Sequence, residues 1–284
     1  MVIRKTGLII LFVFAFAAVI LPSFGQGLAA EAGEAAGYCD DAYGEGVLVE
    51  TLVTDIEYGS ISIYSEHINN GYLPQFTNNN ENLSNVCANI LGANIVGYYD
   101  RYYEQLIPNA SAGTMAGNYF MYYPMSVNSL QKQAVINTFY STMQTNVGHS
   151  GTTLANFKAG LESYVSGKGL TLTYKDMSMN RSILDYGECF ETFENGIPLI
   201  MFLSGYNRCE YSYNGEVFSI TKRIYSGNHA VMVYGIEWVY FYDHNGNIMY
   251  TEIFLNFIDE QGHSKYLIAC SGHLDHIEGV IISQ

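Results

Sequence analysis

A cysteine and a histidine have the types and positions that nucleophilic catalysis requires. Cys87 opens the apolar, helix-like stretch CANILGANIVGYYDRYY, and His229 opens the strand-like stretch HAVMVYGIEW, 142 residues further along. The first turn of a helix favours negative charge through its free backbone N–H groups and its dipole, so the pKa of a thiol placed there falls towards the thiolate. Histidine accepts and returns a proton near neutral pH. The pair therefore predicts covalent chemistry at Cys87 with His229 as its base.

A third group is expected to orient the imidazole ring. The Asn-Gly pair at 245–246 predicts a two-residue hairpin, in which the numbers of paired residues sum to about 491. His229 then lies opposite residue 262, and Asn256 has the parity to share its face of the sheet. Strand twist and a bulge would bring either Asn256 or Asp259 close to the ring. Asn256 is the favoured third residue, and Asp259 is an alternative.

The segments around Cys87 and His229 resemble papain-like cysteine peptidases, in the bacterial branch related to the enzymes that process bacteriocin leaders (double-glycine peptidase-like). NVCANILGANIVGYYDRYY (85–103) resembles the nucleophile helix of that family, although Asn89 and Ile90 replace the usual Pro-Thr and the Gly-Pro after the cysteine is absent. HAVMVYGIEW resembles its histidine strand. TTLANFKAGLESYVSGKGLTLTY and ECFETFENGIPLIMFL resemble the intervening helix and its Gly-x-Pro-then-strand element. The likeness covers residues 60–284 and implies a two-lobed fold and a cofactor-free peptidase.

The resemblance also implies further site residues. KYLIACSGH resembles the family's closing strand and turn, which would place Ser271 at the orienting position. An amide upstream of the cysteine usually helps its backbone N–H to hold the oxyanion. The candidates for that amide are Gln75, Asn80, Asn82 and Asn85.

The pattern of elements predicts an α+β fold, helical first and antiparallel β afterwards. Ser84 or Asn85 is the expected N-cap of the Cys87 helix, and apolar residues at 88, 91, 95, 98 and 99 give that helix one buried stripe. Two more amphipathic helices are expected in SLQKQAVINTFYSTMQT and TLANFKAGLESYVSG. Strands are expected in the segments ISIYSEHI, LTLTY, IPLIMFLSG, CEYSYNGEVFSITKRIY, HAVMVYGIEWVYFYDHNGNIMYTEIFLNFID, KYLIAC and EGVIIS.

Three regions follow from composition. Residues 1–26 have a charged start and an apolar run of 14 residues, Leu8 to Leu21, which predicts a cleaved secretory signal. Such a run spans about 21 Å as a helix, short of the hydrocarbon core of about 30 Å, so no stable membrane insertion is expected after cleavage. Residues 27–58 read as an acidic linker or pro-region, and 59–284 as the papain-like peptidase domain.

Net charge, cysteine count and ligand spacing limit which partners, disulfides and metals are expected. The chain has 12 Lys+Arg against 27 Asp+Glu, a net charge of −15, and loss of Arg4 and Lys5 with the signal leaves −17. Nucleic acid is a poor partner for such a chain. Five cysteines are an odd number; with Cys87 as nucleophile, Cys189 with Cys209 is the most local disulfide. The spacing of His263, His273, Asp275 and His276 matches no strong metal-ligand pattern, so no metal is expected.

Together these features predict a secreted bacterial cysteine peptidase, extracellular or at the cell surface, that acts on a peptide or protein substrate with Cys87, His229 and Asn256 as its catalytic residues and without a cofactor. The alternative is a catalytically inactive papain-like module that serves as an extracellular binding or adhesion domain. Fold analogy does not separate the two. Substrate preference and oligomeric state are not encoded in these motifs.

Overall fold

The structure is a computed structural model that describes residues 47–53, 59–68, 73–110, 113–116, 119–122, 129–179, 183–214, 217–267 and 274–284. All of these residues belong to one compact unit. The expected signal peptide (1–26) and most of the expected linker lie outside the described residues.

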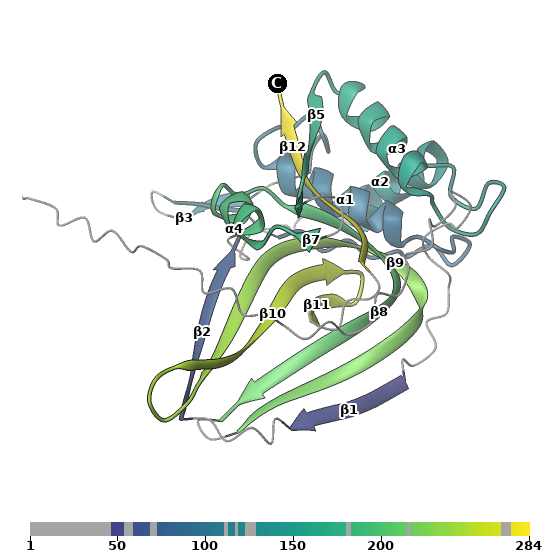
Figure 1. The fold of residues 1–284 in the computed structure, drawn as a ribbon. Helices are drawn as coiled ribbons and strands as arrows, with labels where there is room; N and C mark the ends of the chain where they lie inside the picture. The colour runs from purple at the N-terminus through teal and green to yellow at the C-terminus, as the bar shows by residue number, and fades with distance from the viewer. Residues whose placement is uncertain are drawn as a thin grey trace, which may run out of the picture. The chain divides into compact units, whose positions relative to one another are not determined.

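An eight-stranded antiparallel sheet forms the β part of the fold (Figure 1). Its strands are β1 (Val47–Val53), β2 (Ser60–His67), β5 (Thr171–Asp176), β8 (Leu199–Tyr213), β9 (Phe218–Tyr242), β10 (Ile248–Asp259), β11 (Gly262–Leu267) and β12 (Leu274–Ser283). The order is β1-β9-β10-β11-β8-β12-β5, with β2 also paired to β9. Because β8 pairs with β9 as well as with β11, the strands β9, β10, β11 and β8 close into a ring. Two further two-stranded sheets join β3 (Gly113–Ala116) to β4 (Tyr119–Tyr122) and β6 (Ser178–Met179) to β7 (Ile183–Leu184).

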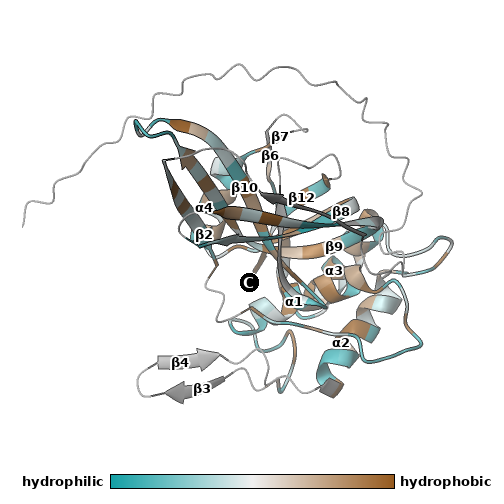
Figure 2. Ribbon diagram, turned by 90° about the horizontal axis from the view of Figure 1, so that it is seen from below, coloured by the Kyte–Doolittle hydropathy of each residue, from teal (hydrophilic) through white to brown (hydrophobic). Residues whose placement is uncertain are grey.

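The strands of the ring contribute a second cluster of buried hydrophobic side chains. Its buried members are Cys209, Phe218, Ile220, Val239, Phe241 and Phe254. The alternation of hydrophobic and hydrophilic bands along the strands in Figure 2 is the pattern of strands with one face towards a core. This second core is separate from the larger one, which lies between the sheet and the helices.

Four helices are described: α1 (Cys87–Asp100), α2 (Ser129–Thr142), α3 (Leu154–Ser166) and α4 (Tyr186–Glu194). Helix α1 packs against α2, α3, β9 and β10, and all 14 of its residues are buried. The sequence pattern predicted a single buried stripe, and the difference arises because neighbours cover every side of the helix. Helix α3 lies within the segment TLANFKAGLESYVSG in which a helix was expected; its N-cap is Thr153 and its C-cap is Gly167.

The α+β class predicted from the sequence is confirmed. Helices α1, α2 and α3 and most of the strands also occupy the segments that the periodicity indicated, whereas α4 was not among the expected helices. One strand lies outside the expected domain: β1 falls within 27–58, the region expected to be a linker or pro-region, and it pairs with β9 in the main sheet. Of the described helices, none is long and apolar enough to span a bilayer.

Candidate functional site

The N-terminal end of α1 carries Cys87 as its first residue. The N-cap position is Val86, which offers no side-chain hydrogen bond to the helix, so the predicted capping by Ser84 or Asn85 is wrong. Asn85 adopts a left-handed φ of 57°, and its amide donates instead to Asn146 Oδ1 (2.8 Å) and Ser150 Oγ (3.0 Å). No capping side chain therefore accepts a hydrogen bond from the N–H groups at the positive end of the helix dipole.

A buried polar group fixes this first turn to the segment that follows α2. The amide of Asn89 donates to Thr145 Oγ1 at 2.9 Å, and Thr145 Oγ1 lies 2.6 Å from Thr152 Oγ1. All three side chains are buried, and buried hydrogen bonds of this kind hold backbone elements in one arrangement. Asn89, which differs from the residue usual in papain-like nucleophile helices, thus has a structural role close to Cys87.

Cys87 is buried and disulfide-bonded. Cys189 and Cys209 are both buried thiols, so the predicted Cys189–Cys209 disulfide is wrong. Cys39 and Cys270 lie outside the described residues. Burial raises the pKa of the Cys189 thiol to about 12, so that thiol is a poor nucleophile.

His229 lies in β9 opposite Leu203 of β8, and only 2% of its surface is exposed. Its Nε2 atom lies 3.0 Å from Asp259 Oδ2 at the end of β10. One face of the imidazole stacks on Tyr206, with ring centroids 4.4 Å apart, and Tyr206 stacks in turn on Tyr225 at 4.5 Å. The ring is held by a carboxylate at one nitrogen and by an aromatic face.

Asp259 is equally buried and receives three contacts. Besides His229, Arg208 Nη2 lies 3.3 Å from Oδ1, and the backbone N–H of Gln261 donates to Oδ1 at 2.8 Å. Burial alone would raise the pKa of this carboxyl, but the hydrogen bond and charge of His229, the charge of Arg208 and the Gln261 N–H outweigh it and lower the pKa. Asp259 is therefore a carboxylate at neutral pH, matched to the imidazole beside it.

A β-bulge explains why Asp259 reaches the histidine. From Tyr250 to Asn256, β10 pairs with β9 in the predicted register, with Asn256 opposite Gly235, but Phe257 then pairs with Val233. This shift of one residue changes which side chains of β10 share the face of His229. The amide of Asn256 instead lies 2.8 Å from His67 Nε2 and 3.1 Å from Glu237 Oε1. Ser271 lies outside the described residues.

Among the candidate oxyanion amides, Gln75 has its side chain close to Gly262, the first residue of β11. A Cβ atom added at Gly262, three residues after Asp259, would be 3.5 Å from Gln75 Nε2. The Gln75 carbonyl accepts from Lys132 Nζ at 3.2 Å, which anchors the backbone there. Asn80 and Asn82 bond to each other in a partly exposed turn, and Asn85 bonds to the segment after α2 as described above.

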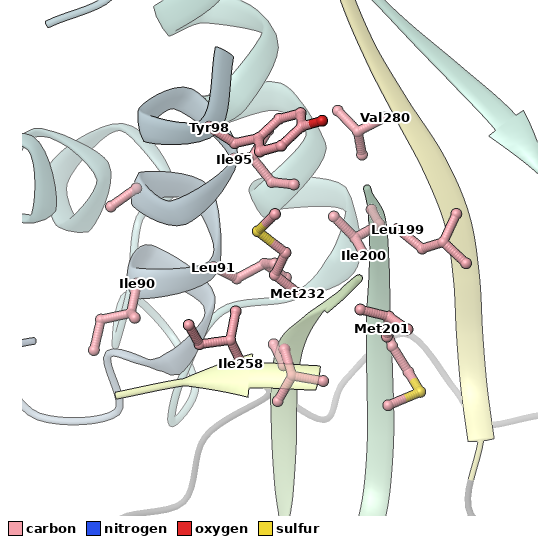
Figure 3. Close-up of a cluster of buried hydrophobic side chains, with 14 of the residues drawn as sticks. Ile90, Leu91, Ile95, Tyr98, Leu199, Ile200, Met201, Met232, Ile258 and Val280 are labelled. Atoms are coloured by element: carbon pink, nitrogen blue, oxygen red, sulfur yellow. The ribbon is translucent and has the colours of Figure 1, made fainter. Parts of the chain in front are cut away.

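Helix α1 and strand β10 meet at the ends that carry these residues. Figure 3 shows Ile90, three residues after Cys87, at the end of α1 nearest to Ile258, whereas Tyr98 lies at the other end of the helix near Val280. Ile258 immediately precedes Asp259 and pairs with Met232, three residues after His229. The end of α1 that carries Ile90 and the end of β10 that carries Ile258 thus lie on the same side of this apolar cluster.

Neither a protein-family model nor a curated protein matches the chain. The site consequently rests on its own geometry. Sequence reasoning missed Arg208 and Tyr206, which contact Asp259 and His229. Both lie in β8 and alternate with Cys209 and Tyr211, which belong to the apolar cluster of the ring of strands. This alternation was the signal that could have placed Tyr206 and Arg208 on the opposite face of β8.

Proposed function

We propose that this chain is a cysteine peptidase of papain-like fold, exported to act on peptide or protein substrates. The observations that carry the proposal are the buried His229–Asp259 pair, whose Nε2 and Oδ2 atoms lie 3.0 Å apart, and the position of Cys87 as the first residue of α1. A carboxylate at one ring nitrogen fixes the tautomer and leaves the other nitrogen to exchange a proton with a nucleophile. Asp259 replaces Asn256 as the orienting residue of this proposal.

The proposed reaction assigns one task to each group. The Cys87 thiolate attacks the peptide carbonyl carbon, and the developing oxyanion is held by the Cys87 N–H and by the Gln75 amide. The imidazolium of His229 then protonates the leaving amine through Nδ1, because Asp259 engages Nε2. Neutral His229 next takes a proton from water, the resulting hydroxide attacks the thioester, and the thiolate is released.

Reduction is a condition for this activity. In the structure Cys87 is in a disulfide, and a disulfide sulfur cannot attack a carbonyl. The oxidised chain should therefore be inactive, and a thiol reductant should activate it by thiol–disulfide exchange.

The test is turnover of an unstructured protein substrate with and without reductant, followed by labelling with an irreversible thiol-directed peptidase inhibitor at pH 6. We expect activity only after reduction, with Cys87 as the modified residue. Cys87→Ala and His229→Ala should abolish turnover. Cys189→Ala is the matched control and should retain it, because that thiol is buried and its pKa is high. Equal labelling of several cysteines, or no turnover by the reduced chain, would refute the proposal.

A second candidate is a binding module in which the Cys87 disulfide is structural. It is favoured by the disulfide itself and by the burial of Cys87, of which 4% is exposed. In that case reduction would lower the stability of the chain and confer no turnover, so the same experiment separates the two functions.

A further inference from the structure

The carboxylate behind His229 is held in a single orientation by its own surroundings. Asp259 Oδ1 contacts two donors, Arg208 Nη2 at 3.3 Å and the Gln261 N–H at 2.8 Å, while Oδ2 lies 3.0 Å from His229 Nε2. A carboxylate free to rotate could present either oxygen to the histidine. The two donors on Oδ1 select the rotamer in which Oδ2 faces the imidazole.

Arg208 is the charged member of this arrangement and is itself firmly held. Its side chain is 13% exposed, its guanidinium carbon lies 5.7 Å from the centre of the Phe257 ring, and Nη1 donates to Gln261 Oε1. Arg208 thus binds the Asp259 carboxylate directly and also holds Gln261, the residue whose backbone N–H binds the same oxygen. A planar guanidinium with several donors suits such a double contact, and a lysine can reproduce only part of it.

We infer that Arg208 is a positioning residue for the proposed catalytic pair: it fixes Asp259 so that the carboxylate accepts the Nε2 proton of His229 and presents the imidazole to Cys87. The inference rests on the proposed peptidase function. Arg208 contacts neither the nucleophile nor the substrate in this mechanism, so its effect passes through Asp259. Misplacing a catalytic group by about 1 Å costs about 10²-fold in rate, which sets the expected size of the effect.

The chain offers a matched control on the neighbouring strand. Arg223 of β9 pairs directly with Arg208 of β8 but is exposed. Arg223→Met makes the same replacement as Arg208→Met and removes the same positive charge, but it leaves the contact between Arg208 and Asp259 in place. Arg208→Lys keeps the charge but loses the fork of donors.

Kinetics of the reduced chain give the first readout. For Arg208→Met we expect kcat to fall about 10²-fold with KM within twofold of wild type, because the lost contact orients the proton-transfer group and does not bind substrate. Arg208→Lys should recover part of kcat, and Arg223→Met should match wild type. Wild-type kcat in a folded Arg208→Met variant, or an equal loss in Arg223→Met, would overturn the inference.

A spectroscopic readout separates this inference from the proposed function. The Nε2–H proton of His229, bonded to a buried carboxylate, should give a downfield proton resonance in the wild type and in Arg223→Met. The resonance should be lost or broadened in Arg208→Met. If that pattern appears in a chain without turnover, Arg208 positions the pair and the peptidase proposal fails. If the resonance persists unchanged in Arg208→Met, the inference fails whether or not the chain is a peptidase. Should Arg208→Met not fold, Arg208→Lys decides: a resonance and kcat identical to wild type would overturn the need for the fork of donors.

Discussion

Replacing Asp259 by asparagine should destabilise the chain through loss of a single buried charge. The carboxylate is 3% exposed and is the counter-charge of Arg208, which is also largely buried, and the partner of His229. Removing one partner of a buried pair costs about 3–5 kcal/mol. Asparagine keeps the shape and one acceptor oxygen, so we take the lower end and expect the free energy of unfolding to fall by about 3 kcal/mol at pH 7.

Urea denaturation followed by circular dichroism measures this loss. With a slope of about 2 kcal/mol per molar, the midpoint should fall by about 1.5 M while the slope stays constant. The pH dependence has a definite sign. Because the folded-state pKa of Asp259 is lowered, its stabilisation is present above the unfolded value of about 3.9 and is lost as the pH falls through the folded value. The difference between Asp259→Asn and wild type should therefore shrink below about pH 4.

Glu191→Gln provides the control, since it removes one exposed carboxylate from α4. It should change the free energy of unfolding by no more than about 0.5 kcal/mol. A midpoint for Asp259→Asn within error of that control at pH 7, or a difference that persists unchanged at pH 3, would refute the account of Asp259 as an ionised, buried counter-charge.

Three further changes have expected outcomes. Asp100→Asn should stabilise the chain at pH 8 and do little at pH 4, because burial raises the pKa of Asp100 to about 7 and the ionised carboxylate is unfavourable above that pH. The free energy of unfolding measured in urea should rise by at most about 4 kcal/mol at pH 8, and a fall at that pH would contradict the prediction. Gly235→Ala should lower the free energy of unfolding by about 1–3 kcal/mol, because the new Cβ would lie 2.2 Å from His67 Cδ2; an unchanged urea midpoint would refute that contact. Gln75→Ala should lower kcat of the reduced chain by about 10²-fold or more, because it removes a proposed oxyanion donor, whereas Asn82→Ala should leave kcat unchanged. Equal kinetics of the two variants would show that Gln75 does not belong to the site.

The sequence was informative wherever local pattern decides structure. Alternation and the Asn-Gly turn at 245–246 predicted the pairing of β9 with β10, and the predicted register holds from Tyr250 to Asn256. The bulge that follows lies at Tyr234 and Gly235 of β9, and the glycine inside this strand pattern was the available signal. The choice between Asn256 and Asp259 depended on that one inserted residue.

The errors concern features that tertiary contacts decide. A single buried stripe was predicted for α1, but the whole helix is buried because α2, α3 and the sheet surround it. Cys189 and Cys209 are close in sequence, yet they lie in α4 and in the ring of strands and remain separate thiols. Asn85 is polar and well placed for a cap, but its amide is used by Asn146 and Ser150.

Strand β9 has a consequence for the order in which the chain can assemble during synthesis. It pairs with β1, β2, β8 and β10, and the contact of His67 with Glu237 spans 170 residues of sequence. Strands β1 and β2 are therefore made early and have no described partner until the last quarter of the chain emerges. Contacts of such long range slow folding and leave strand edges open to association in the meantime. A nascent or truncated chain that ends before β9 should thus depend on a holding chaperone, and the length of chain released from it should coincide with the completion of β9.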